Sequence, residues 1–225
     1  GNLYEAQRDE VNTSITTKEM VFATSVWAEG YTGAESKIAI IDTGTNQDHI
    51  SFSDAAFEHS LLKKGKSLSS YNLLTSAKIQ AVASQLNVSG DAAFSAEAVY
   101  KNSKIPYAYN YIDHNTTTDH DSDSQGAHGS HVSGIAAANS YVWQDGEFVD
   151  AASTVYVVGA APDAQIVTMK VFGAGGGAYD SDYFAAIEDS IVLGCDSANL
   201  SLGSANPGFS FDNSYQEVLD SLVKS

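Results

Sequence analysis

The feature that most constrains this chain is a short apolar run, Lys37 to Ile41, that stops at the turn Asp42-Thr43-Gly44. A continuous apolar run closed by a turn is typical of a strand buried on both faces of a parallel sheet. The run therefore predicts an α/β fold with Asp42 at the carboxyl end of a strand. Open α/β sheets place their functional sites at this edge, so Asp42 is a candidate site residue.

A second feature is a histidine at the start of a stretch of small residues. Residues 126–134 read Gly-Ala-His-Gly-Ser-His-Val-Ser-Gly and run into an apolar, alanine-rich segment. We expect a helix to begin near His128, with the imidazole presented at its end, where it could act as a base in proton transfer. Small residues let such a helix approach a neighbouring sheet closely. A lone histidine is more often a buried one that is satisfied by the backbone.

The two segments together resemble the subtilisin-like serine proteases, the subtilases. Ile40-Ile41-Asp42-Thr43-Gly44 is similar to the family's aspartate motif, and residues 128–134 are similar to its histidine motif. The resemblance covers roughly residues 20–225 and implies a mostly parallel sheet with helices on both faces, incomplete in this chain. It also implies that Asp42 and His128 are two members of an Asp-His-Ser triad that hydrolyses protein or peptide substrates.

A third element agrees with this resemblance. The pattern predicts a buried strand over 166–172, a glycine-rich loop over 173–177 and a helix over 180–193. Further strands are expected over 108–113 and 196–201. The resemblance implies that two extended segments hold the substrate peptide between them, and glycines allow the close approach of an added strand. The residues implied to line the cleft are Gly176, Gly177, Ala178, Ser201, Leu202 and Gly203.

The family's nucleophile lies in a Gly-Thr-Ser-x-Ala motif, and its oxyanion asparagine follows an Ala-Gly pair. Neither motif occurs in the 225 residues. Ser221 lies in a predicted helix without the motif and is not a candidate nucleophile. We therefore expect the serine and the asparagine to lie downstream or in another chain, which makes the remaining part of the protease a partner. This chain alone is expected to be inactive, and no cofactor is required.

The chain divides into an N-terminal arm, 1–18, and a portion of the catalytic domain, 19–225. An insertion at about 51–103 separates the two motifs, with helices expected at 55–62 and 73–86. It either packs beside the cleft or decorates the surface. The insertion and residues 158–165 are most similar to the large cell-envelope proteinases of the lactocepin type, which implies a secreted or cell-envelope location.

The composition excludes several other classes. A net charge of −17 without a basic patch argues against nucleic acid. No run approaches the roughly 18 apolar residues that a membrane span needs, so no transmembrane segment is expected. The single cysteine, Cys195, is expected to be a small buried apolar residue rather than a reactive thiol.

Acidic residues and histidines leave two alternatives open. Asp119, Asp121 and Asp123 alternate in one loop and make a structural calcium ion possible, but Ser124 and Ser130 stand where an EF-hand needs glycine and glutamate. No metal ligand is assigned. A hydrolytic metal site is one alternative, although the sequence has no H-E-x-x-H motif. Its candidate ligands would be His114, Asp119, His120, Asp121, His128 and His131. A non-catalytic, subtilisin-like scaffold that binds peptides or regulates a partner is the other alternative.

Overall fold

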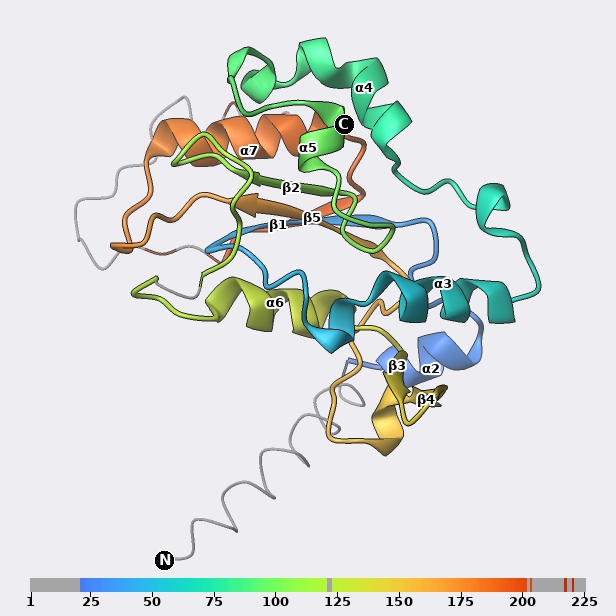
Figure 1. Cartoon of the computed structure of the whole chain (residues 1–225). Helices are drawn as coiled ribbons and strands as arrows, with labels where there is room; N and C mark the ends of the chain where they lie inside the picture. The colour runs from blue at the N-terminus through green and yellow to red at the C-terminus, as the bar shows by residue number, and fades with distance from the viewer. Residues whose placement is uncertain (1–20, 121–122, 202, 204–216, 218–219, 221–225) are drawn as a thin grey trace, which may run out of the picture.

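The computed structural model describes residues 21–120, 123–201, 203, 217 and 220. Its centre is a four-stranded parallel sheet in the order β2-β5-β1-β6, which lies between two layers of helices (Figure 1). The fold is therefore α/β with a mostly parallel sheet flanked by helices on both faces, as predicted. The strands are β1 (Lys37–Asp42), β2 (Tyr107–Asn110), β5 (Gln165–Lys170) and β6 (Ser197–Asn199).

Helices cover the two faces of this sheet unequally. One face carries α4 (Ser76–Val82), α5 (Ala96–Val99) and α7 (Asp180–Val192), and the other carries α3 (Asp54–Lys63) and α6 (His128–Ala137) (Figure 1). Beyond α3 and α6 lie α2 (Ala23–Ala28) and an antiparallel hairpin that the sequence did not predict, β3 (Tyr141–Gln144) and β4 (Glu147–Asp150). Single 3-10 turns are η1 (Ile50–Phe52), η2 (Leu68–Ser70), η3 (Ala83–Gln85), η4 (Asn87–Gly90) and η5 (Ala151–Ser153).

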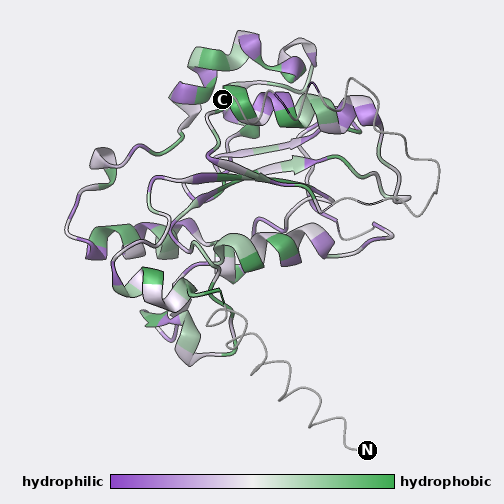
Figure 2. Cartoon of the chain, turned by 180° about the vertical axis from the view of Figure 1, so that it is seen from behind, coloured by the Kyte–Doolittle hydropathy of each residue, from purple (hydrophilic) through white to green (hydrophobic). Residues whose placement is uncertain are grey.

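Side chains alternate between the two faces of the sheet along each strand, so each one points toward one of the two helix layers. Ile41 and Met169 belong to the cluster that packs against α7, whereas Ile40 and Ile166 belong to the cluster that contains Ala137 of α6. Figure 2 shows hydrophobic and hydrophilic segments side by side on the helices of both layers. Because successive strand residues face opposite sides, Asp42 lies on the same face as Ile40 and points toward α6.

The structure corrects several predicted boundaries. The strand expected at 108–113 ends at Asn110, because the chain turns back there and the Asn110 amide donates to the Asn115 carbonyl at 2.8 Å. The strand expected at 196–201 is shortened to β6. The helix expected at 73–86 is α4 followed by the single turn η3, since Thr75 is the extended N-cap of α4 and the Leu74 amide before it donates to the Gln165 side chain at 2.7 Å. The expected arm, 1–18, lies outside the described residues.

The insertion does not lie wholly beside the predicted cleft. Asn72, Leu74, Lys78 and Val82 line a shallow pocket together with Lys37, the first residue of β1, and the end of α7. This pocket is at the amino-terminal edge of the sheet, opposite Asp42. This part of the insertion therefore lies at the opposite edge of the sheet from Asp42, and a position of the rest beside the cleft stays a prediction.

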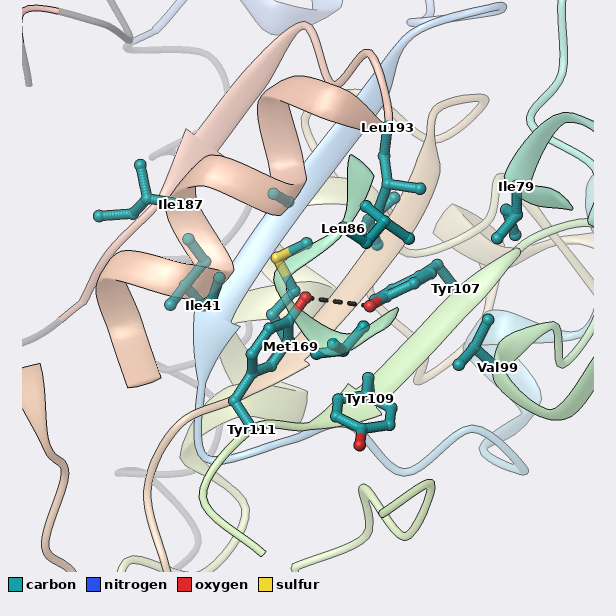
Figure 3. Close-up of a cluster of buried hydrophobic side chains, with 14 of the residues drawn as sticks. Ile41, Ile79, Leu86, Val99, Tyr107, Tyr109, Tyr111, Met169, Ile187 and Leu193 are labelled. Atoms are coloured by element: carbon teal, nitrogen blue, oxygen red, sulfur yellow. Dashed lines mark hydrogen bonds between the residues drawn. The ribbon is translucent and has the colours of Figure 1, made fainter. Parts of the chain in front are cut away.

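A buried polar network ties another part of the insertion to α7. The hydroxyls of Tyr107 and Tyr111 are 3.0 Å apart (Figure 3), and Tyr111 donates to Oδ2 of the fully buried Asp189 at 3.0 Å. The backbone amide of Asn87, in η4, donates to the other oxygen of Asp189 at 2.7 Å. Burial raises the pKa of Asp189, and the hydrogen bonds from Asn87 and Tyr111 oppose this rise.

We expect Asp189→Ala to lower the free energy of unfolding by about 2 to 4 kcal/mol, because it removes the acceptor of the Asn87 amide and leaves the two buried tyrosine hydroxyls with one acceptor fewer. Asp189→Asn is the matched control and should cost less than about 1 kcal/mol, since its amide can still accept from Asn87 and can donate to Tyr111. The raised pKa means that the folded state binds a proton more tightly than the unfolded one. As pH falls through the folded-state pKa of Asp189, protonation of this residue therefore raises the free energy of unfolding. Asp189→Asn lacks this pH dependence. Urea denaturation over a pH series measures both effects.

Candidate active site

Asp42 lies at the end of the strand between β5 and β6 and is 1% exposed. Its Oδ1 accepts two hydrogen bonds, from the Thr43 amide at 2.7 Å and from Nδ1 of His128 at 2.8 Å. The two residues are separated by 86 positions in the sequence, and the structure brings them into direct contact. A buried carboxylate that orients an imidazole is thus present at the carboxyl edge of the sheet.

His128 is the first residue of α6, and its side chain is 46% exposed. A carboxylate only accepts hydrogen bonds, so Nδ1 carries the proton and Nε2 is the free acceptor of the neutral ring. Within the described part of the chain, no protein group bonds to Nε2. The ring is therefore fixed through one nitrogen, while the other can take a proton from a hydroxyl.

Two glycines allow the close approach of these motifs. A Cβ at Gly129 would lie 2.1 Å from the Gly44 carbonyl oxygen, and a Cβ at Gly44 would lie 2.1 Å from that of Thr118. Gly44 also has a φ of +107°, which side chains rarely adopt. The Gly129 amide donates to Oγ1 of Thr43 at 2.9 Å. Both motifs therefore need a glycine at these positions: Gly129 lets the start of α6 lie against the end of β1, and Gly44 lets that end lie against the Thr118 backbone.

The residues predicted to line the cleft follow the two strands that flank β1. Gly176, Gly177 and Ala178 lie in the loop after β5, which is closed by a hydrogen bond from the Gly173 amide to the Gly177 carbonyl at 2.9 Å. Ser201 and Gly203 follow β6 and are exposed. Because the strands are parallel, both segments leave the same edge as Asp42. Leu202 lies outside the described residues.

Sequence reasoning did not find the contacts of Lys170, a buried lysine near this site. Lys170, only 3% exposed, donates from Nζ to the Thr43 carbonyl at 2.6 Å and forms an ion pair with Asp123. A lysine within the apolar 166–172 strand was the available signal, since buried lysines need partners. Only the strand register places it beside Asp42.

Where the structure describes the acidic loop and its neighbouring histidines, their contacts do not assemble a metal site. Asp123 pairs with Lys170, His114 with Asp91, and His120 with Ser130. Among the described residues, no three His, Cys, Asp or Glu side chains are grouped to hold a metal ion. Asp121 lies outside those residues, and the structural calcium ion stays a prediction.

Cys195 packs at the margin of the core cluster that contains α7. Burial raises the pKa of its thiol to about 12, so it is protonated at neutral pH. This agrees with the expected role as a small apolar residue. Separately, the helices within the described ranges are all too short or too polar to cross a membrane.

Comparison with known proteins identifies the family of this chain. Residues 33–224 match the model of the subtilase family, and the chain belongs to this family. The chain is 46% identical over 109 residues to the PI-type proteinase of Lactococcus lactis subsp. cremoris and 44% identical over the same length to the PII-type proteinase of Lacticaseibacillus paracasei. Each match covers 47% of this chain and 5% of the relative.

A more distant relative extends the similarity along the chain. The minor extracellular protease Vpr of Bacillus subtilis is 26% identical over 188 residues, which cover 81% of this chain and 16% of that protein. The predicted similarity to the subtilases and to their large proteinases is confirmed. The matched region spans only about 5% of the length of the lactococcal relatives.

Proposed function

We propose that this chain supplies the aspartate and the histidine of a serine endopeptidase whose catalytic serine and oxyanion asparagine lie downstream or in another chain. The observation that carries the proposal is the hydrogen bond of 2.8 Å between Asp42 and Nδ1 of His128 at the carboxyl edge of the sheet. Family membership supports the class of reaction.

In the proposed reaction, Nε2 of His128 takes the proton from the serine hydroxyl as its oxygen attacks the carbonyl carbon of a peptide bond. The Asp42 carboxylate stabilises the imidazolium that forms. The imidazolium then gives its proton to the leaving amine, and the acyl group remains on the serine. Water, activated by the same nitrogen, hydrolyses this ester and completes the cycle.

The proposed substrate is an extended peptide bound between the segments that follow β5 and β6. Gly176, Gly177 and Ala178 would border one side, and Ser201, Leu202 and Gly203 the other. The position of Asp42 on the intervening strand supports this arrangement. Main-chain hydrogen bonds would hold the peptide as an added strand.

A secreted or cell-envelope location is part of the proposal. It is supported by the relative from Bacillus subtilis, whose name describes an extracellular protease. The proposed partner is the remaining part of the protease, because the Gly-Thr-Ser-x-Ala motif that carries the nucleophile is absent from the 225 residues.

The chain alone should not hydrolyse peptides, because loss of the nucleophile costs about 10⁶ in kcat in subtilisin. Mixing or co-expressing it with the part of the protease that carries the serine should restore cleavage of a fluorogenic peptide. The measurement is the initial rate for each part alone and for the two together.

The matched control is the same mixture made with His128→Ala, which should remain inactive. Cleavage by the mixture that does not depend on His128 would contradict the proposal. Absence of cleavage with both parts folded would instead favour the non-catalytic scaffold.

A further inference from the structure

We propose that Lys170 and Asp123 are positioning residues for the catalytic pair, and that their buried ion pair fixes the Thr43 peptide and through it the Asp42 carboxylate. The inference rests on the proposed peptidase function. Neither residue lies in the aspartate motif, 40–44, or in the histidine motif, 128–134.

The strand register brings Lys170 to the site. β1 and β5 are parallel, and Asp42 is the partner of Lys170 in the ladder. Partner residues on neighbouring strands point to the same face of a sheet, so both side chains lie on the face covered by α6. Lys170 is 3% exposed, and its ammonium is directed at the turn that follows Asp42, where it donates to the Thr43 carbonyl at 2.6 Å.

Thr43 is the residue through which the lysine acts. Its amide donates to Oδ1 of Asp42 at 2.7 Å, its Oγ1 accepts from the Gly129 amide at 2.9 Å, and its carbonyl accepts from Lys170. The turn is thus held at three atoms. Without the ammonium, the Thr43 carbonyl loses its buried donor, and rotation of this residue shifts the amide that orients the carboxylate.

Asp123 supplies the counter-charge and a second attachment. Its side chain is 8% exposed and pairs with Nζ of Lys170, which a buried ammonium requires. Asp123 lies in the loop that leads into His128, and the next amide, of Ser124, donates to the Ala174 carbonyl at 2.8 Å. The ion pair therefore joins the ends of β1 and β5 to the segment that carries the histidine.

The test compares two buried lysines in the complete protease. Lys170→Met removes the ammonium beside Asp42, whereas Lys104→Met removes one that is fully buried and donates to the Pro162 and Ala164 carbonyls at 2.9 and 2.6 Å, next to the start of β5. Both variants should be less stable. Only Lys170→Met should lower kcat per folded enzyme, roughly 10- to 100-fold with KM nearly unchanged, because a small misplacement of a catalytic group has an effect of that size.

Two further variants separate positioning from stability. Asp123→Asn keeps the bond from Lys170 to Thr43 and should lose less kcat than Lys170→Met. The double variant that combines Asp123→Asn with Lys170→Met buries no unpaired charge, so its unfolding midpoint should recover toward wild type while kcat stays low. If Lys170→Met does not fold, the double variant carries the test.

Either of two results in the single variants would overturn the inference alone: a His128-dependent protease in which Lys170→Met keeps the wild-type kcat, or an equal loss of kcat in Lys104→Met. Wild-type kcat in the double variant would overturn it as well. A wild-type protease without any His128-dependent hydrolysis would overturn the proposed function, and this inference with it.

Discussion

Replacing His128 with alanine in the complete protease is expected to lower kcat by about 10⁶, the size of loss found when the triad histidine of subtilisin is removed. Alanine cannot take the proton from the serine hydroxyl, and the buried Asp42 carboxylate then has no imidazole to orient. The effect should fall on kcat, because His128 is proposed to act on the reacting atoms rather than on the substrate's main chain. Single-turnover kinetics on a peptide ester and a peptide amide would measure the acylation step.

His131→Ala is the matched control, since this histidine lies one turn further along α6 and is exposed. Oδ1 of Asp42 is occupied by the Thr43 amide and by His128, so His131 has no part in orienting this carboxylate. We expect kcat within about twofold of wild type, as for a typical exposed substitution. Equal losses in both variants would contradict a specific role for His128.

The sequence could predict the architecture and the meeting of Asp42 with His128 because each depends on local patterns. The apolar run before Asp42 has the composition of a strand buried on both faces, and that run is β1. The small residues after His128 match a helix that packs closely, and a Cβ at Gly129 would indeed collide with Gly44. Chemistry at a strand end and at a helix start is thus visible in short motifs.

Contacts between distant strands are not visible in this way. The ladder between β1 and β5 pairs residues that are 128 positions apart, from Asp42 to Lys170, and no local pattern sets that register. A lysine in an apolar strand indicates only that some buried partner exists. Its choice of Asp123 and of the Thr43 carbonyl depends on how the loop before α6 folds back.

The prediction for the insertion was partly wrong for a related reason. Its helical periodicity over 73–86 was correct near Ile79, which is fully buried, but the Gln165 side chain competes for the backbone at Leu74. Gln165 bonds to both the amide and the carbonyl of Leu74, at 2.7 and 3.1 Å, and this residue lies outside the helix. A tertiary hydrogen bond therefore overrides local helix propensity.

Asp42→Asn is expected to lower kcat by about 10⁴ while the fold stays intact, in line with the smaller loss found for the triad aspartate than for the histidine. The Thr43 amide needs an acceptor at the Oδ1 position, so the asparagine should place its carbonyl oxygen there. Its NH₂ group then takes the place of Oδ2, which has no hydrogen-bond partner among the described residues. The bond to His128 persists, and the loss arises from the missing charge that stabilises the imidazolium.

The double variant that combines Asp42→Asn with His128→Ala distinguishes this explanation from independent effects. If the carboxylate acts only through the imidazole, the double variant should be no slower than His128→Ala alone, because residues that act as a unit are not additive. Thermal unfolding of Asp42→Asn should be at or above the wild-type midpoint, since the variant removes a buried charge. A further loss of about 10⁴ in the double variant would show that Asp42 acts on the reaction by a route other than His128.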